Sequence, residues 1–478
     1  MTEHARCTKV VATLGPASCS PAAVAALVDA GMDVARVSFS HGRPEDQLAL
    51  IRLVRAVSGD RPVGVLADLP GPKVRAGAFP AGGAELVEGT LVTLAPGGGG
   101  STGQRLEVVA EAAVEGLQPG DVVAVGDGAI QLRVESADAG EAKARVVRGG
   151  HVEGRPGLSL PTSALAERVP TAKDRALLER CVAAGVDMVA VSFVRSAAEL
   201  SDVCAAAGDD PPMILAKIET AEAVADLEGI LGVADGVMVA RGDLGIRLPL
   251  EDVPHVQKHI IRTSIAAGRP VITATQMLES MITSLSPTRA EVSDVANAVF
   301  DGTDALMLSA ETAVGVDPPQ AVRTMVRVAE RAEREADYAQ WGAKLGRLRR
   351  KAEVPLRLAI TDAVSHAAWQ AAASVGAAAI VCCSRSGSTA RAVARFRPVA
   401  PMLAVSPSLR AVRQLSLTWG IRAFPGTERR TTDEIVWHAV EELSGRGLLA
   451  KGDVVVVVAG FPHDPEPAAD VMRVVRVR

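Results

Sequence analysis

Short apolar runs recur along the chain, and each is followed by a polar cluster and then by an alanine-rich helical pattern. The apolar character of these runs is continuous, which is typical of parallel strands that are buried on both faces. Eight such runs predict an α/β fold, an eight-stranded parallel β/α (TIM) barrel inside a ring of helices. The predicted strands are residues 9–13, 34–38, 62–67, 187–192, 213–216, 236–240, 270–273 and 304–308, and the ring helices include 21–30, 173–184, 219–231 and 318–336.

The alternation of apolar runs and helical patterns is interrupted between the third and fourth predicted strands. Short alternating segments such as LVTLA, DVVAV, IQLRVES and AKARVVR are separated there by the turn sequences PGGGGSTG, QPGD and VGDGA. Alternation with turns of this kind predicts a small β domain, a β-barrel, inserted into a barrel loop. The run Gly97–Gly100 lacks the strand-loop-helix context of a phosphate loop, so we expect it to be a flexible hairpin tip.

A smaller α/β domain is predicted after a charge-dense helix and linker. Its elements are the helices 358–374, 389–396, 408–417 and 432–444 and the strands 377–384, 401–405 and 453–460. The expected domains are therefore the first part of the barrel (1–70), the inserted β domain (71–165), the second part of the barrel (166–340), a linker (341–356) and a C-terminal α/β domain (357–478).

The candidate chemistry lies between residues 213 and 245. Lys217 and Glu219 follow one apolar run, Arg241 and Asp243 follow the next, and a helical stretch separates the runs as in one β-α-β step. Consecutive parallel strands deliver these side chains to the same end of the sheet, where ligands of α/β folds bind. A lysine beside two carboxylates suits a metal-bound phosphate.

Composition and charge narrow the function classes. The chain has 478 residues, of which 48% are hydrophobic and 22% charged, and this length predicts two to four domains. A net charge of −5 argues against nucleic acid as a partner. The six cysteines form no CxxC pair, and the sequence has no signal-peptide pattern and no apolar run of about 20 residues, the length of a membrane span. We therefore expect a cytoplasmic protein without a membrane partner.

Several longer phrases stand in a fixed order along these strands. They are TKVVATLGPAS at the first strand, ARVSFSHG at the second, KIE at the fifth, MVARGDLG at the sixth, TATQMLESM at the seventh and PTRAEVSDVANAVFDGTDALMLSAET through the eighth. In these phrases the chain resembles the pyruvate kinase family over essentially its whole length. The resemblance implies a glycolytic, Mg²⁺- or Mn²⁺-dependent transfer of phosphate from phosphoenolpyruvate to ADP that gives pyruvate and ATP, carried out by an allosteric homotetramer.

The resemblance assigns roles to six residues of the barrel. Lys217 and Arg36 would neutralise the transferring phosphoryl group, and Glu219 and Asp243 would hold the divalent ion. The backbone N–H groups of Gly242 and Asp243 would hold the substrate carboxylate, together with the hydroxyl of Thr275.

Two points of this chemistry stay open. Thr275 would lie near the face where the enolate is protonated, either as the donor or beside a water relay. Ser309 and Glu311, in the phrase LSAET, would complete that relay or only shape the barrel mouth.

The monovalent-cation site departs from the family pattern. Members activated by K⁺ usually have Asn, Ser and an Asp-Thr pair where this chain has Ser38, Ser40, Asp68 and Leu69, and the following glutamate is Lys73. An ammonium group near such a site repels K⁺ or takes its place. We expect that Lys73 replaces K⁺ and that the enzyme does not require the ion.

The nucleotide site departs as well. His41 and Arg75 would lie toward the nucleotide, but the family's basic pair before glycine appears as Arg155-Pro156 and its Asp-Asp-Gly as Gly126-Asp127-Gly128. Proline supplies neither a charge nor an N–H group, so we expect Arg155 to take over the nucleotide contact.

The phrase CSRSGSTARAVARFRP in the C-terminal domain offers hydroxyls, backbone amides and a guanidinium at a helix start. By resemblance, Ser384, Arg385, Ser386, Ser388 and Thr389 would grip a phosphorylated effector; a hydroxyl-rich helix cap is the alternative. The family's glycine-rich second effector loop is absent from residues 460–470. A monophosphate such as AMP or a hexose or pentose phosphate is therefore favoured over fructose 1,6-bisphosphate.

Two other functions compete with a kinase. A lyase acting on a pyruvate enolate would keep the barrel and the metal, but it needs no ADP site. A catalytically weak metabolite sensor fits Pro156, whereas the intact set of Lys217, Glu219, Asp243 and Thr275 argues against it.

Overall fold

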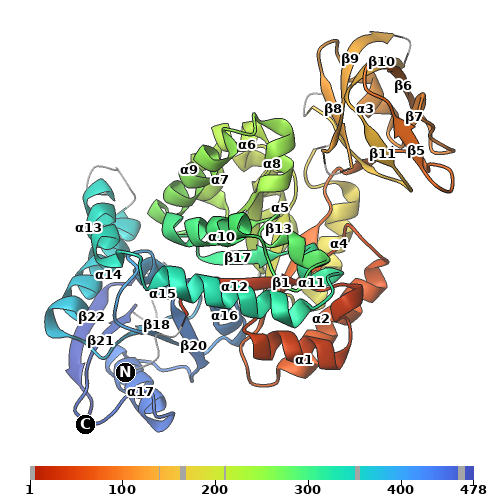
Figure 1. Cartoon of the computed structure of the whole chain (residues 1–478). Helices are drawn as coiled ribbons and strands as arrows, with labels where there is room; N and C mark the ends of the chain where they lie inside the picture. The colour runs from red at the N-terminus through yellow and green to blue at the C-terminus, as the bar shows by residue number, and fades with distance from the viewer. Residues whose placement is uncertain are drawn as a thin grey trace.

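The computed structural model describes residues 6–126, 128–138, 140–161, 168–208, 211–349, 356–460 and 469–478. Its centre is a closed parallel barrel with the strand order β1-β17-β16-β15-β14-β13-β3-β2, which confirms the predicted fold class (Figure 1). The strands are β1 (Lys9–Thr13), β2 (Val34–Ser38), β3 (Gly64–Leu69), β13 (Met188–Val191), β14 (Met213–Ile218), β15 (Gly236–Ala240), β16 (Val271–Ala274) and β17 (Ala305–Leu308).

Helices cover the outside of this barrel. The helix α10 shows how the sequence sets their limits, since Thr288 and Glu291 form a capping box at its start and Gly302, with φ of 95°, ends it. The helices are α1 (Pro21–Ala30), α2 (Pro44–Ser58), α4 (Ala172–Ala183), α5 (Ala197–Ala206), α6 (Ala221–Ala225), α7 (Leu227–Val233), α8 (Arg241–Arg247), α9 (Val253–Ala266), α10 (Arg289–Asp301), α11 (Ala310–Ala313) and α12 (Pro318–Glu333), with 3-10 turns at Pro16–Ser18 and Glu279–Ile282. The helix expected over 219–231 is two helices, because the chain breaks at Asp226 between α6 and α7.

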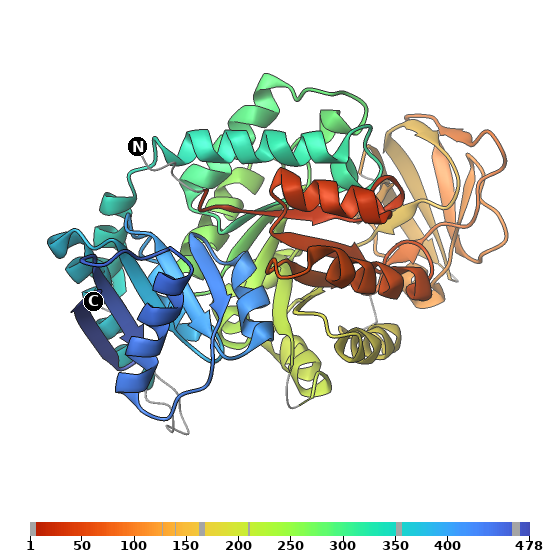
Figure 2. The same ribbon diagram turned by 90° about the horizontal axis from the view of Figure 1, so that it is seen from below.

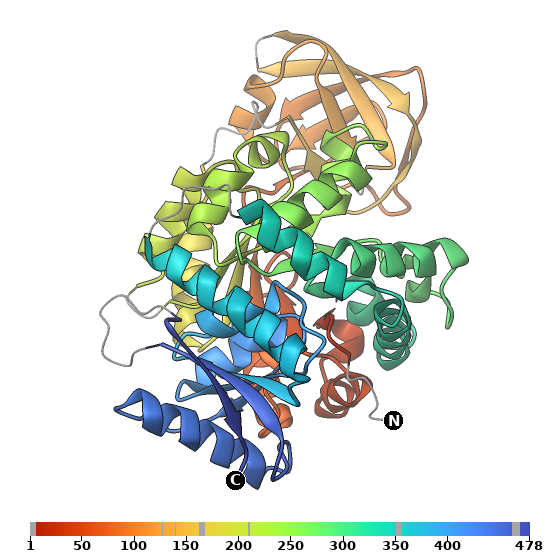
Figure 3. The same cartoon turned by 90° about the vertical axis from the view of Figure 1, so that its left-hand side faces the viewer.

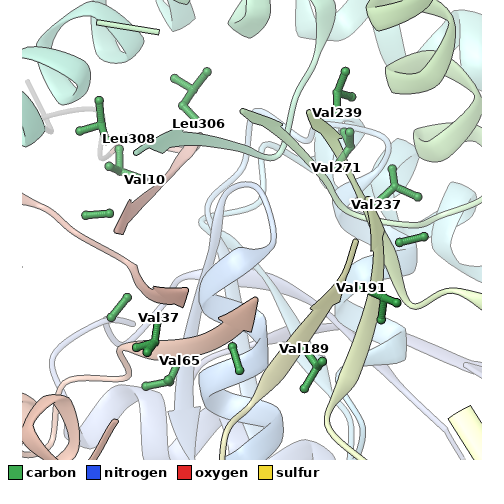
Figure 4. Close-up of a cluster of buried hydrophobic side chains, with 14 of the residues drawn as sticks. Val10, Val37, Val65, Val189, Val191, Val237, Val239, Val271, Leu306 and Leu308 are labelled. Atoms are coloured by element: carbon green, nitrogen blue, oxygen red, sulfur yellow. The ribbon is translucent and has the colours of Figure 1, made fainter. Parts of the chain in front are cut away.

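The barrel strands are buried on both faces, as their continuous apolar runs predicted. Val10, Val37 and Leu308 lie on the outer side of the ring and pack with residues of the surrounding helices (Figure 4). Val11 and Leu215 belong to a separate cluster inside the barrel. The two clusters use alternate residues of the same strands, because successive side chains of a strand point to opposite faces.

The inserted segment is a β domain that stands at one end of the barrel (Figure 1). A seven-stranded sheet has the order β4-β12-β8-β9-β10-β6-β7, and β11 pairs with β5. The elements are β4 (Val74–Arg75), β5 (Ala84–Leu86), β6 (Leu91–Pro96), β7 (Arg105–Val108), α3 (Glu111–Glu115), β8 (Val122–Val125), β9 (Ile130–Asp138), β10 (Glu141–Arg148), β11 (Gly150–Val152) and β12 (Gly157–Ser159).

The expected hairpin tip at Gly97–Gly100 is wrong. The strands on either side of it, β6 and β7, pair in parallel, so the segment is a crossover rather than a hairpin turn. The backbone N–H groups of Gly99 and Gly100 donate to Oε2 of Glu107, at 2.5 and 3.0 Å. The glycines allow the backbone to fold over this carboxylate, which is a structural role.

The C-terminal domain is a five-stranded sheet with the order β20-β19-β18-β21-β22. Its elements are α14 (Leu356–Val375), β18 (Ala379–Cys383), α15 (Ser388–Ala394), β19 (Met402–Ser406), α16 (Leu409–Gln414), a 3-10 turn (Leu415–Leu417), β20 (Ile421–Pro425), α17 (Thr432–Gly445), β21 (Val454–Ala459) and β22 (Val471–Arg476), and α13 (Tyr338–Arg349) precedes it. The strands β20 and β22 were not expected. The domain boundaries given above stay a prediction.

The C-terminal domain packs against the opposite end of the barrel from the inserted domain (Figures 2 and 3). Leu417 is fully buried and belongs to the cluster inside the barrel. Arg397 is also buried and forms a 3.0 Å ion pair with Asp304, just before β17. The C-terminal domain therefore closes the amino-terminal end of the barrel and leaves the carboxyl ends of the strands to face the inserted domain. In the described part of the chain, no helix has both the length and the apolarity that a bilayer span requires.

Candidate active site

The charged residues predicted from the sequence meet at the carboxyl ends of the barrel strands. Lys217 lies near the end of β14 and Glu219 follows that strand, while Asp243 lies in the first turn of α8, directly after β15. Asp68 lies near the end of β3, and Arg36 lies in β2. The barrel thus brings together residues from four strands that are far apart in the sequence.

Asp68 is buried between two cations. Its Oδ2 accepts a hydrogen bond from Nε of Arg36 at 2.7 Å, and its Oδ1 lies 3.5 Å from Nζ of Lys217. Although burial raises it, the pKa of Asp68 is held below its ordinary value by Lys217 and Arg36. Burial lowers the pKa of Lys217, but Asp68 and neighbouring carboxylates raise it above its ordinary value. The site therefore presents fixed positive charge at neutral pH.

Glu219 and Asp243 supply the carboxylates of the site. Glu219 is fully buried, and its Oε1 lies 2.8 Å from Nζ of Lys217 in an ion pair. Burial raises the pKa of the Glu219 carboxyl; Lys217 opposes this effect and Asp243 adds to it. The Lys217 ammonium is thus the charged partner of Oε1.

This pair fits a divalent ion of the magnesium type. In the described ranges, no group of three or more His, Cys, Asp or Glu side chains is arranged around a common metal position. Mg²⁺, however, usually takes only one or two protein carboxylates and completes its shell with water and substrate oxygens. The fully buried Glu219 carboxylate and the half-buried Asp243 carboxylate together meet that need.

A tight turn after β16 carries Thr275. Its φ is 68°, in the left-handed region that non-glycine residues rarely adopt. The guanidinium of Arg241 donates to the carbonyl of Thr275 at 2.6 Å and pairs with Asp294 at 2.6 Å, which holds this turn in place. Oγ1 of Thr275 accepts a hydrogen bond from the backbone N–H of Gly242 at 2.8 Å. The hydroxyl and the backbone of α8 therefore face each other.

Glu311 uses its carboxylate to order the mouth of the barrel. It is buried and accepts hydrogen bonds from the backbone N–H groups of Leu278, at 3.1 Å, and Ser309, at 2.6 Å. These contacts favour the shaping role that the sequence left open for Glu311. Oγ of Ser309 is buried and has no hydrogen-bond partner in the described part of the chain.

Comparisons with known proteins agree with this geometry. The family model described as "Pyruvate kinase, barrel domain" matches residues 5–322, and "Pyruvate kinase, alpha/beta domain" matches residues 362–475. The chain belongs to the pyruvate kinase family. The fold class, the family and the enzyme class expected from the sequence, a phosphotransferase, are confirmed.

Individual members of the pyruvate kinase family match almost the whole chain. The "Pyruvate kinase" of Methylorubrum extorquens is 39% identical over 474 residues, which cover 99% of this chain and 98% of the relative. The "Pyruvate kinase" of Mycobacterium tuberculosis is 40% identical over 474 residues and 98% of both chains. "Pyruvate kinase 2" of Synechocystis sp. is 41% identical over 478 residues, 98% of this chain and 79% of the relative.

The residues expected at the monovalent-cation site of the pyruvate kinase family lie around β2 and β3. Oγ of Ser38 accepts a hydrogen bond from the N–H of Ser40 at 3.4 Å, and the carbonyl of Leu69 accepts one from Oγ of Ser192 at 2.7 Å. Burial lowers the pKa of Lys73 below its ordinary value, and the Asp243 carboxylate opposes this effect.

A pocket of the inserted segment, beside Ser40 of the barrel, holds Arg75 and Arg155, two of the residues expected at the nucleotide. A cavity of about 340 Å³ is lined by Lys73, Arg75, Val109 and Arg155. Arg75 donates to the carbonyls of Arg155 and Ser40 at 3.2 and 3.3 Å. Partial desolvation lowers the pKa of His41, and the positive charges of Lys73, Arg75 and Arg36 lower it further. Asp127, which the sequence analysis also named, lies outside the described residues.

The expected effector residues follow β18 and begin α15. Gly387 has a φ of 78° at the helix start, and Oγ of Ser386 donates to Oγ of Ser388 at 3.1 Å. Arg385 is exposed and lies 3.5 Å from Glu428, while Thr389 is buried. Ser384, directly after β18, donates its N–H to the carbonyl of Val405 in β19 at 3.2 Å. Most of the segment expected to lack the second effector loop, residues 461–468, lies outside the described residues.

Two residues that line or support the site were missed by the sequence analysis. Ser192 follows β13 and accepts a hydrogen bond from Lys217 at 2.8 Å. Lys173 lines a larger cavity, of about 630 Å³, that extends from the nucleotide pocket along Gly71 and Ala172. A signal existed for Ser192, which is a polar residue at the end of a predicted apolar strand, as Lys217 is.

Proposed function

We propose that the chain transfers the phosphoryl group of phosphoenolpyruvate to ADP in glycolysis and releases pyruvate and ATP. The observation that carries the proposal is the buried cluster of Arg36, Asp68 and Lys217 beside the carboxylates Glu219 and Asp243. Fixed cations next to a pair of metal-type carboxylates suit a transferring phosphoryl group, whose equatorial oxygens carry charge.

Lys217 and Arg36 are the groups proposed to bind the phosphoryl oxygens. The carboxylate of Asp68 contacts both cations: Oδ1 lies 3.5 Å from Nζ of Lys217, and Oδ2 lies 2.7 Å from Nε of Arg36. Because their positions are fixed before substrate binds, little reorganisation is needed when charge moves toward the leaving oxygen. Arg36 can grip the phosphate through two parallel hydrogen bonds, which a lysine cannot do.

The backbone of Gly242 and Asp243 is proposed to bind the substrate carboxylate. The N–H of Gly242 donates to Oγ1 of Thr275. A bound carboxylate would take over that N–H, and the Thr275 hydroxyl, which donates to the carbonyl of Ala274 at 2.6 Å, would turn its hydrogen from that carbonyl to the substrate. Thr275, directly or through a water, is then the candidate for guiding a proton to the enolate carbon.

Glu219 and Asp243 are proposed to hold Mg²⁺ or Mn²⁺. A divalent ion bound there would neutralise charge on the phosphoryl oxygens and orient the substrate. The chain's own residues remove water from around these carboxylates, since Glu219 is fully buried.

We also propose that the enzyme requires no K⁺, because Lys73 supplies a positive charge near the carboxylates. Activity measured with and without K⁺ at constant ionic strength tests this, and strong activation by K⁺ would contradict it. The matched variant Lys73→Glu should introduce K⁺ activation.

The pocket of Arg75 and Arg155 is the proposed ADP site, and His41 is proposed to lie toward the nucleotide. A basic pocket of this kind supports a kinase over a lyase, which would have no use for it. Arg155→Ala should raise KM for ADP and leave KM for phosphoenolpyruvate within twofold of wild type. Equal changes in both constants would remove Arg155 from the nucleotide site.

A phosphorylated metabolite is the proposed regulator, bound by Ser384, Arg385, Ser386, Ser388 and Thr389. Titration with AMP and with hexose and pentose monophosphates should change the phosphoenolpyruvate saturation curve, and Arg385→Ala should weaken the response. Activation by micromolar fructose 1,6-bisphosphate would reverse the preference for a monophosphate. A homotetramer in the cytoplasm is proposed as the working form, and sedimentation velocity measures its mass.

A further inference from the structure

Two residues that directly follow β13 contact the two charged groups at the end of the neighbouring strand, β14. Ser192, only 2% exposed, accepts a hydrogen bond from Nζ of Lys217 at 2.8 Å. Its own hydrogen is used elsewhere, because Oγ lies 2.7 Å from the carbonyl of Leu69 but 3.4 Å from Asp68. A hydroxyl has one hydrogen and two lone pairs, so donation to Leu69 turns a lone pair toward the ammonium.

Phe193 makes the corresponding contact with Glu219. Its backbone N–H donates to Oε2 of Glu219 at 2.8 Å. The direction of this N–H depends on an uncommon backbone conformation, with φ of 58°. A side chain at Gly71 would come within 2.9 Å of the Phe193 ring and 3.1 Å of the Ser192 carbonyl, so the chain after β3 packs closely over this turn. The guanidinium of Arg247 lies over the ring at 5.4 Å.

These two contacts fix the directions of Lys217 and Glu219. The ammonium and the Oε1 oxygen are 2.8 Å apart, the ordinary length of a charge-assisted hydrogen bond, so their distance is set by that bond but the orientation of each group is not. Ser192 holds the ammonium from one side, and the N–H of Phe193 holds the far oxygen of the carboxylate from the other.

We propose that Ser192 and Phe193 are positioning residues with separate tasks: Ser192 orients Lys217 toward the phosphoryl group, and the backbone of Phe193 orients Glu219 toward the metal. The proposal rests on the proposed roles of Lys217 and Glu219. It predicts that substitution of Ser192 lowers kcat, whereas substitution of Phe193 weakens Mn²⁺ binding.

The first test is Ser192→Ala. A hydrogen bond to a charged group is worth about a factor of 10 to 100, so kcat for pyruvate formation should fall by at least about tenfold. The dissociation constant of Mn²⁺, measured without substrate from the electron paramagnetic resonance signal of free Mn²⁺, should stay within twofold of wild type. Ser192→Thr keeps the hydroxyl and should recover most of the loss. Ser201→Ala is the matched control, because the hydroxyl of this exposed serine on α5 donates to the carbonyl of Ala197 in its own helix.

The second test separates the backbone of Phe193 from its ring. Valine is β-branched and disfavours a positive φ, whereas glycine adopts it freely. Phe193→Val should raise the Mn²⁺ dissociation constant by at least about tenfold, and Phe193→Gly should retain an affinity close to wild type. If Phe193→Gly loses as much affinity as Phe193→Val, the ring and not the N–H is what matters, and the Phe193 half of the proposal is overturned.

Two further variants keep this proposal distinct from the proposed function. Lys217→Met should abolish transfer and Glu219→Gln should abolish Mn²⁺ binding; if either keeps its wild-type value, the assigned role of that residue is wrong. If both behave as expected but Ser192→Ala loses less than tenfold in kcat, or loses Mn²⁺ affinity in parallel, the positioning role of Ser192 is overturned. Melting temperatures of all variants identify any loss that comes from unfolding.

Discussion

Replacing Asp68 by asparagine removes the negative charge that lies between Arg36 and Lys217. The side chain of Asp68 is 2% exposed, and those of Arg36 and Lys217 are 14% and 12% exposed. Removing one member of a buried ion pair typically costs about 3 to 5 kcal/mol, because the remaining charge is left in a poorly solvated site. Lys217 retains contacts with Glu219 and Ser192, and asparagine still accepts a hydrogen bond, so we expect the lower end, about 3 kcal/mol.

The assay is urea-induced unfolding of the wild type and the variant, compared at the transition of the barrel. Asp46→Asn is the matched control, because Asp46 pairs with Arg43 at the surface, where the two side chains are 55% and 79% exposed. Because water screens such an exposed pair, Asp46→Asn should lower the free energy of unfolding far less than Asp68→Asn does. If Asp68→Asn and Asp46→Asn lower the free energy of unfolding equally, the buried cluster does not stabilise the barrel as described.

Three more predictions follow from specific contacts. Arg241→Ala releases the carbonyl of Thr275 and the strained turn at φ of 68°, so kcat should fall at least about tenfold while circular dichroism stays unchanged; an unaltered kcat would refute the role of the turn. Arg397→Ala leaves Asp304 buried without its 3.0 Å partner and should lower the free energy of unfolding by about 3 kcal/mol in urea, against no measurable change if the interface is incidental. The hydrogen bond to Glu153 raises the pKa of His151, so Glu153→Gln should lower that pKa in an NMR titration; an unchanged pKa would contradict the contact.

The barrel could be predicted because its physical signal is strong. Strands buried on both faces are apolar over most of their length, and runs such as that of β15 (Gly236–Ala240) therefore stand out from the helices around them. The strands β20 and β22 were missed for the opposite reason. β20 has an exposed arginine, and β22 lies at the sheet edge with half-exposed residues, so neither forms a continuous apolar run. The parallel pairing around Gly97–Gly100 depends on distant strands, and local turn residues could not reveal it.

The charged residues of the site could be predicted from spacing, but their supports could not. Lys217 and Glu219 are close in sequence and meet Asp243 through one β-α-β step, so topology alone brings them together. The contact of Ser192 with Lys217 depends on side-chain direction across two strands. The turn at Thr275 depends on a positive φ that threonine rarely adopts, so its residue type gives no hint of it.

The most direct test of the central claim is pyruvate formation from phosphoenolpyruvate and ADP, coupled to lactate dehydrogenase, with Mg²⁺ or Mn²⁺ present. Wild type should form pyruvate, and Lys217→Met should lose nearly all of that activity, because no other side chain of the cluster reaches both Asp68 and Glu219 in the described contacts. Absence of pyruvate formation by the wild type, or full activity of Lys217→Met, would contradict the account.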